Sequence, residues 1–400
     1  MCLSPSRPAA LALALALALA LALALALAGC GGSGSPDRDR LSPQAALGER
    51  IFNDASLSAS GRQSCASCHV AATGDAQDNA LAAQLGGADL SLQGSRTSPS
   101  IRYLAFGTAF RLDGGGTPSG GFFWDGRASS LAEQARRPFF NPVEMALASP
   151  AELAARLAKA DYAKDFATLY GPDILSRPDD ALQAVGLAVQ QFELEDVRLR
   201  AFSSKFDSFL RGTTTLSAAE ARGLAAFEDP LKGNCNSCHT SAKSRDGTHP
   251  LFTNFTYHAL GVPRNAELVA NADPAHADLG LCAREGGDLA ARADLCGSFK
   301  VPSLRNVALR RALFHNGRFK TLGDAVDFYA QRDTRPDRFY PALPDGSVDR
   351  YDDLPPQFKA NVNRGEAPYD RVPGGVPAIS PAEVADIVAF LATLTDGWTP

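Results

Sequence analysis

The chain has 400 residues, of which 45% are hydrophobic and 21% are charged, and its formal net charge is −5. These proportions exclude a disordered polymer, a coiled coil and a disulfide-stapled miniprotein. The mild acidity and the lack of a long basic run argue against nucleic acid as the main partner. The chain has eight cysteines, which are too few for a disulfide scaffold of this length, so each needs its own explanation.

The N-terminus carries an apolar run of mostly Leu-Ala repeats over residues 9–28, preceded by the single basic residue Arg7. A Leu-Ala helix of this length could span a bilayer. Because the run leads through Leu-Ala-Gly to Cys30 and a polar linker, it resembles a bacterial lipoprotein signal, in which Cys30 carries lipid and Cys2 is removed. The alternatives are an uncleaved membrane anchor and a soluble exported protein. Each of these places the remaining chain on the periplasmic side of a bacterial membrane.

Two copies of the motif C-x-x-C-H occur, at residues 65–69 and 235–239. Two thiols one helical turn apart can add to the two vinyl groups of haem, and the adjoining His then lies under the iron. Neither a zinc site nor a C-x-x-C redox site explains why His follows the second Cys both times. The sequence therefore predicts two covalent haems c, held by Cys65, Cys68 and His69, and by Cys235, Cys238 and His239.

The remaining cysteines, Cys282 and Cys296, lie in a loop rich in Gly and Asp. In an oxidising compartment they most simply form one disulfide, worth roughly 3 kcal/mol by loop entropy. Ligation of a metal or of a haem by a thiolate is the alternative.

Each motif follows a helix with a readable start. A Ser-Pro pair opens the helix at residues 42–52, and a Ser-x-x-Glu capping box opens the helix at residues 217–227. Each half also closes with an amphipathic helix, at about 179–196 and about 381–395. The sequence thus predicts a mainly α fold of two tandem cytochrome-c-like domains. The full division is a signal segment at 1–29, a linker at 30–41, a haem 1 domain at 42–205 and a haem 2 domain at 206–400.

The loops downstream of the two motifs repeat as well. The stretch PSIRYLA at residues 99–105 matches PSLRNVA at 302–308, and FWDGR at 123–127 matches FHNGR at 314–318. A second axial ligand to a haem iron must come from this downstream part, normally as His, Met or occasionally Tyr.

The repeat predicts a difference between the two haems. Tyr329 lies 14 residues after His315, whereas the residue at the matching position of the first half is Pro138, which cannot bind iron. No His occurs between residues 70 and 238. We therefore expect haem 1 to be open to peroxide and haem 2 to be closed by Tyr329. The alternative is that Tyr329 is only a packed aromatic residue and that Met145 binds haem 1.

Two stretches resemble a known family. These are FWDGRASSLAEQARRPFFNPVEM at residues 123–145 and FKVPSLRNVALRRALFHNG at residues 299–317. Both are similar to signatures of the bacterial dihaem cytochrome c peroxidase/MauG superfamily, and the resemblance extends over roughly residues 42–395.

This resemblance implies roles for individual residues. Glu144 would be the acid–base group that moves the peroxide proton, and Gln134 would line the same pocket. Trp124 would lie between the haems and relay electrons. His69 and His239 would be the proximal ligands of the two irons.

Two features resemble the MauG branch of the superfamily. Other members carry a distal His after the first motif that must move before peroxide binds, and they use Met where this chain has Tyr329. Without that His, haem 1 should be active without reductive priming. An anionic oxygen ligand at haem 2 would stabilise its oxidised states, so that the two haems share oxidising equivalents. One feature departs from the branch: Gly233 stands where MauG has a Trp that draws electrons from a protein substrate.

The superfamily also binds Ca²⁺ between the haems. The matching positions here are Thr97, Arg310 and Ala312. Because a guanidinium at this place would repel Ca²⁺ and could stand in for its charge, we predict that the calcium site is altered or absent.

Three functions are compatible with these features. The first is an exported, lipid-anchored dihaem peroxidase, which reduces hydrogen peroxide at haem 1 with electrons passed through haem 2 from a small cytochrome c or cupredoxin. The second is a MauG-like oxidase that acts on a partner protein. The third is a non-catalytic dihaem electron carrier, in which both haems would be six-coordinate.

Overall fold

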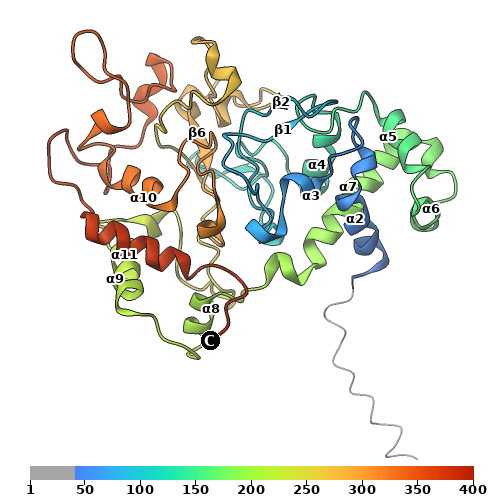
Figure 1. The fold of residues 1–400 in the computed structure, drawn as a ribbon, viewed down its shortest axis with the longest axis horizontal. Coiled ribbons are helices and arrows are strands. Elements are labelled where there is room, and N and C mark those ends of the chain that lie inside the picture. Colours follow the sequence, from blue (N-terminus) through green and yellow to red (C-terminus); the bar gives the residue numbers. More distant parts are fainter. Residues whose placement is uncertain (1–40) are drawn as a thin grey trace, which may run out of the picture. The chain divides into compact units, whose positions relative to one another are not determined.

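The computed structural model describes residues 41–400. The expected signal segment, the lipidated Cys30 and the linker up to residue 40 lie outside the described residues. Between residues 41 and 400, no helix combines the length and the apolar character needed to cross a bilayer. The described chain is mainly helical, and its strands form three small antiparallel pairs (Figure 1).

The helices occur in two groups along the chain, one in each half. Those of the first half are α2 (Pro43–Asn53), α3 (Cys65–Cys68), α4 (Leu131–Arg136), α5 (Pro150–Leu157), α6 (Ala163–Tyr170) and α7 (Pro178–Glu195). Those of the second half are α8 (Lys205–Leu210), α9 (Ala218–Glu228), α10 (Leu322–Gln331) and α11 (Pro381–Ala392). The strand pairs are β1 (Leu85–Gly86) with β2 (Leu92–Gln93), β3 (Arg111–Leu112) with β4 (Pro118–Ser119), and β5 (Tyr257–Ala259) with β6 (Ser298–Lys300).

The helix starts agree with the capping signals in the sequence. The Ser42 side chain accepts a hydrogen bond from the Ala45 amide at the start of α2. Reciprocal capping boxes open α9 and α11, as expected. Helix α11 ends at Ala392, earlier than the expected 395, because Thr393 and Leu394 donate to carbonyls only three residues back and so tighten the last turn.

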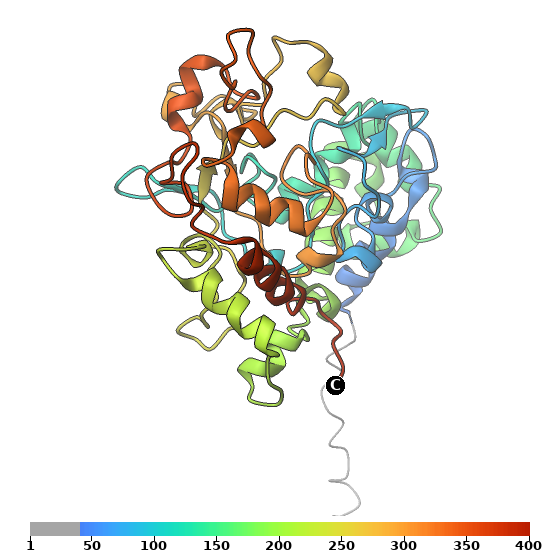
Figure 2. The ribbon, with the colours of Figure 1, turned by 60° about the vertical axis from the view of Figure 1, so that its left-hand side comes forward.

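The opening and closing helices of each half cross in close contact. A Cβ atom on Gly48 of α2 would lie 1.9 Å from the Ala188 carbonyl oxygen of α7, and a Cβ on Gly223 of α9 would lie 1.9 Å from the Asp386 carbonyl oxygen of α11. Only glycine permits these crossings. Figures 1 and 2 show α11, in dark red, next to α9, and α2 across α7.

The apolar core has two main clusters, each within one half. The first takes its members from residues 47–199 and the second from residues 206–394. The second cluster contains four phenylalanine rings, and five of their six pairs have centroids 5.3 to 6.2 Å apart: Phe206, Phe227, Phe252 and Phe390. The boundary between domains at residues 205 and 206 stays a prediction.

The repeated turn of the sequence has the same backbone conformation in both halves. Phe123 and Phe314 have φ values of 65° and 63°, and Gly126 and Gly317 have φ values of 68° and 61°. A bulky residue at positive φ is uncommon, so its occurrence at equivalent positions shows that the repeat is structural. In the first half this turn carries Trp124.

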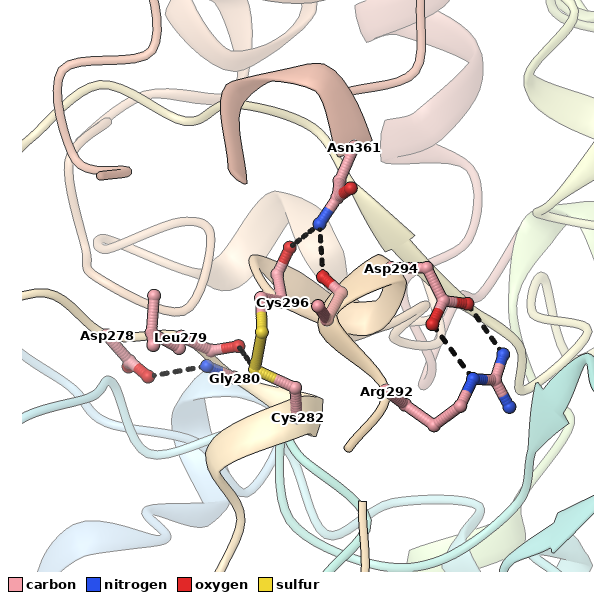
Figure 3. The surroundings of a disulfide bond; sticks show 9 residues. Asp278, Leu279, Gly280, Cys282, Arg292, Asp294, Cys296 and Asn361 are labelled. Atoms are coloured by element: carbon pink, nitrogen blue, oxygen red, sulfur yellow. Dashed lines mark hydrogen bonds and ion pairs between the residues drawn. A yellow bond between two sulfur atoms is a disulfide. The ribbon is translucent and has the colours of Figure 1, made fainter. Parts of the chain in front are cut away.

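Cys282 and Cys296 form a disulfide whose surroundings are shown in Figure 3. Both residues are buried in a small apolar cluster with Tyr257. The Asn361 side-chain amide donates hydrogen bonds to the carbonyls of Ala293 and Cys296, and so attaches the loop to the C-terminal part of the chain.

An ion pair with no solvent exposure lies within the second half. The two terminal nitrogens of Arg305, Nη1 and Nη2, donate to the Asp207 carboxylate at 2.9 and 2.8 Å. Both side chains are 0% exposed. The same carboxylate contacts His249 Nδ1 at 2.6 Å. Burial alone would raise the pKa of Asp207, but the hydrogen bonds and charge of Arg305 hold it well below its ordinary value.

We predict that Asp207→Asn destabilises the holoprotein by about 3–5 kcal/mol, because it leaves a buried guanidinium without its counter-charge. Urea unfolding at neutral pH measures the loss. Since the folded-state pKa of Asp207 is depressed, its contribution is present above the ordinary Asp pKa and disappears as the pH falls towards the depressed value.

The exposed pair between Arg177 and Asp180 provides a control. Its side chains are 55% and 54% exposed. Asp180→Asn should therefore cost at most about 1 kcal/mol. Equal losses for the two variants would show that burial does not govern the Asp207 pair.

Candidate functional site

Two open cavities lie in the described chain, and each is lined by one of the C-x-x-C-H motifs. The first contains Cys65, Cys68 and His69, and the second contains Cys235, Cys238 and His239. With their open mouths included, they enclose about 2300 Å³ and about 1570 Å³. The predicted site residues thus form two groups. Glu144, Gln134 and Trp124 line the first cavity, whereas Tyr329 and, again, Trp124 line the second.

The two motif histidines have the same arrangement. His69 Nδ1 lies 3.2 Å from the Asp75 carbonyl oxygen, and His239 Nδ1 lies 2.8 Å from the Phe252 carbonyl oxygen. A carbonyl only accepts, so Nδ1 carries the proton and the Nε2 lone pair stays free for a metal. Burial lowers the pKa of His69, and lowers that of His239 to about 4. Both imidazoles are therefore neutral, the form that binds iron.

Glu144 is positioned in the first cavity by a backbone contact to the β1–β2 hairpin. The Gly87 amide donates to the Glu144 carbonyl at 2.7 Å. A Cβ on Gly86 would lie 2.3 Å from the Val143 carbonyl oxygen, so glycine permits this approach. Burial raises the pKa of the Glu144 carboxyl, while the charge of Arg127 opposes the rise. Burial of this carboxyl thus disfavours its charged form.

Apart from His69, no histidine of residues 41–400 lines the first cavity. Gln134 reaches this cavity from α4, and Pro138 reaches it from the next turn, η4 (Pro138–Phe140). Met145 also borders the cavity, but it is 4% exposed and belongs to the first apolar core.

Tyr329 projects from α10 into the second cavity. Its ring stacks at 5.6 Å on Phe314 and lies 5.9 Å from Tyr369. Burial raises the pKa of the Tyr329 phenol, and among the described residues no side chain donates a hydrogen bond to its hydroxyl. The hydroxyl is thus free for a ligand, although its coordination to haem 2 stays a prediction.

Trp124, Lys300 and Arg310 line both cavities and so form part of the wall between them. The Trp124 indole donates to the Thr97 carbonyl at 2.9 Å, and the Lys300 amide donates to the Trp124 carbonyl at 2.8 Å. Two backbone contacts therefore fix the indole between the cavities.

The two cations of this wall have no carboxylate partner in the described chain. Lys300 Nζ donates to the Gly121 carbonyl at 2.7 Å, and Arg310 donates to the Ser98 carbonyl at 3.1 Å. Burial lowers the pKa of Lys300 to about 8 and that of Arg310 to about 10. Buried cations without a partner are costly. Haem carries two carboxylates, so the wall, the thiols and the free imidazole nitrogens all fit haem c.

The positions expected for calcium do not fit that ion. Thr97 Oγ1 is already engaged, since it donates to the Phe314 carbonyl at 2.9 Å. The Arg310 guanidinium is already a buried positive charge at this place.

Sequence reasoning missed several residues of the two cavities. His258 lies in the second cavity with Nε2 3.4 Å from Cys238 Sγ. His315 stacks on Phe299 at 3.5 Å, and its buried Nε2 has no partner in the described chain. Glu193 lines the first cavity from α7. The repeated turn marks the position of His315. No motif or spacing marks His258 or Glu193, because only the tertiary fold brings them to the cavities.

The comparisons with known proteins agree with this geometry. A family model described as di-haem cytochrome c peroxidase matches residues 42–215. The chain is 35% identical over 361 residues to the methylamine utilization protein MauG of Paracoccus denitrificans, over 88% of both proteins. It is 30% identical to the cytochrome c551 peroxidase of Nitrosomonas europaea, over 71% of both.

A solved structure shows the same fold. The dihaem peroxidase BthA from Burkholderia thailandensis superimposes with a TM-score of 0.82 at 39% identity, over 90% of this chain and 87% of that one. Motif, fold and similarity over most of its length together show that the chain is an oxidoreductase of the dihaem cytochrome c peroxidase/MauG family.

Proposed function

We propose that the chain is an exported dihaem c peroxidase built of two cytochrome-c-like domains, residues 42–205 and 206–400. Cys65 and Cys68 would attach the first haem and Cys235 and Cys238 the second. The observation that carries the proposal is the content of the first cavity: the Glu144 carboxyl, whose charged form burial disfavours, and, among the described residues, one histidine only.

Haem iron with a free coordination position supplies peroxide binding and electron transfer. Glu144 holds a proton at its carboxyl oxygen and gives it to the oxygen that leaves the peroxide. The Gln134 amide orients the peroxide from the same wall. Reduction of one H₂O₂ to two H₂O takes up two protons and two electrons. The Trp124 indole, held between the cavities, lies on the path of the electrons.

The second cavity supplies the proposed entry for electrons. Tyr329 and His239 would both hold the second haem iron, so that this haem would transfer electrons and be closed to peroxide. The electron donor would be a small cytochrome c or cupredoxin. The proposed location is the periplasmic side of a bacterial membrane, with Cys30 as a lipid anchor.

One observation favours a second candidate, a MauG-like oxidase of a partner protein. A phenol ligand such as Tyr329 stabilises oxidised iron, which would let the protein hold oxidising equivalents until a partner arrives. Peroxide added to the diferric protein separates the two. Rapid turnover with reduced cytochrome c supports the peroxidase, whereas a long-lived oxidised product that reacts slowly with cytochrome c supports the oxidase.

We predict that Glu144→Gln slows the reaction of the diferric protein with peroxide by about 10²- to 10⁴-fold, because the amide cannot give a proton. Stopped-flow absorbance after peroxide addition measures the rate. Glu49→Gln, outside both cavities, is the control and should leave the rate unchanged. An unaltered rate in Glu144→Gln would remove this carboxyl from the mechanism.

Tyr329→Phe should change the spectrum of the second haem and raise its reduction potential, because an anionic oxygen ligand that stabilises oxidised iron is lost. Electron paramagnetic resonance and a potentiometric titration of the holoprotein provide the readouts. Tyr369→Phe is the matched control, since it removes the neighbouring phenol. If both variants keep the wild-type signals, Tyr329 is a packed aromatic residue only.

The purified holoprotein should contain no stoichiometric, tightly bound Ca²⁺, since Arg310 stands at one of the expected ligand positions and its guanidinium would repel the ion. Elemental analysis measures the metal content, and EDTA should alter neither the visible spectrum nor peroxide turnover. One Ca²⁺ per chain after gel filtration would contradict this prediction.

A further inference from the structure

A second carboxyl group, distinct from that of Glu144, lies in the first cavity and has no partner in the described chain. Glu193, on α7, is 3% exposed and lines this cavity. Among the described residues its carboxyl makes no hydrogen bond or ion pair, and Oε2 is buried without a partner. Leaving a buried carboxyl unsatisfied costs folding free energy. The cost of burying the Glu193 carboxyl therefore has to be offset by something in the cavity.

The internal repeat shows that this acid is not part of the common scaffold. Position 48 approaches Ala188 and Phe192, just as position 223 approaches Asp386 and Phe390. In this register the counterpart of Glu193 is Leu391, and each lines the cavity of its own half. The same place on the closing helix therefore carries leucine beside the second motif and glutamate beside the first.

The charged groups near Glu193 do not neutralise it. From α3, Cys65 supplies no positive charge, because burial and then the negative charge of Glu193 raise the pKa of its thiol. From α2, Phe52 lines the same cavity, and η3 (Leu104–Phe106) contains no titratable side chain.

The remaining elements packed against α7 direct their charges elsewhere. The α4 cation Arg136 packs against Gly186, two turns before Glu193. The α5 charges Glu152 and Arg156 pair with each other, and η5 (Ile174–Ser176) contains no titratable side chain. Burial raises the pKa of Glu193 to about 8. A positive charge that meets this carboxyl has to come from the group held in the cavity.

We propose that Glu193 is a redox-linked proton acceptor for the haem held by Cys65 and Cys68, ionised when that haem is oxidised and protonated when it is reduced. This inference rests on the haem site of the proposed function. When a one-electron donor reduces the haem, the Glu193 carboxylate takes one proton from solvent, and it releases that proton when the electron leaves. The physical reason is electrostatic. A buried carboxylate stabilises the extra positive charge of the oxidised haem, and without that charge the proton returns.

The test is a potentiometric titration of both haems in the holoprotein at a series of pH values between about 5 and 9. In the wild type, the potential of the first haem should fall as the pH rises, by up to about 59 mV for each tenfold fall in proton concentration. In Glu193→Gln and Glu193→Leu, the second of which copies Leu391, this slope should flatten. The second haem serves as the internal control and should not change.

A slope in both Glu193 variants that equals the wild-type slope would overturn the proposal. Glu144→Gln is titrated in parallel, to separate the contribution of the other carboxyl group. Spectra that show two c-type haems in the wild type establish the haem site independently, so a failure of the proposed function is distinguishable from a failure of this inference.

An infrared difference spectrum provides a second readout. Reduction of the wild-type protein should produce the band of a neutral carboxyl group, and this band should be missing in both Glu193 variants. Its absence in the wild type would overturn the proposal even if the variants fail to take up haem. Its persistence in the variants would assign it to another acid.

Discussion

Each half of the structure depends on one steric constraint, the close crossing of its opening and closing helices at a glycine. At Gly48 and at Gly223 the partner backbone approaches so closely that any side chain would collide with it. This contact sets the height and rotation of α7 and α11, and so decides which of their side chains reach the cavities. Val189 and Glu193 line the first cavity, and Ile387 and Leu391 line the second. The chemistry of each cavity is therefore a consequence of how two helices pack.

Both cavities contain charged side chains that have no partner of opposite charge among the described residues. Lys300 and Arg310 lie half-buried between the cavities without a carboxylate, and Glu193 is buried beside the first without a cation. In a closed apolar core these groups would be costly. Their cost is offset when each cavity holds a group with its own charges, carboxylates at one end and a metal at the centre. The protein part alone is thus electrostatically incomplete, and its unpaired charges describe what it binds.

Local signals in the sequence were sufficient for much of the fold. The two motifs, the capping residues and the repeated turn depend on neighbours within a few positions, so their spacing predicts the structure directly. The sequence pattern also showed that Tyr329 and Pro138 stand at equivalent positions with different ability to bind iron, because the repeat aligns the two halves. It could not identify Lys300 and Arg310 as partnerless cations, since pairing depends on segments distant in sequence. Glu193 follows Gln191 and Phe192 near the end of an amphipathic helix, where a charged residue normally faces solvent. Only the helix crossing turns it inward.

The same scaffold carries different side chains at three equivalent positions, and these differences agree with the division of work that we propose for the two halves. Where the first half has Trp124, Pro138 and Glu193, the second has His315, Tyr329 and Leu391. Pro138 leaves one face of the first cavity without a ligand, whereas Tyr329 offers an oxygen atom to the second. Glu193 gives the first cavity a proton site that Leu391 denies to the second. A reaction that consumes protons together with electrons needs such sites where the peroxide binds and has no use for them at a centre that only passes electrons. The repeat therefore carries its extra acid, Glu193, in the half where the proposed reaction consumes protons.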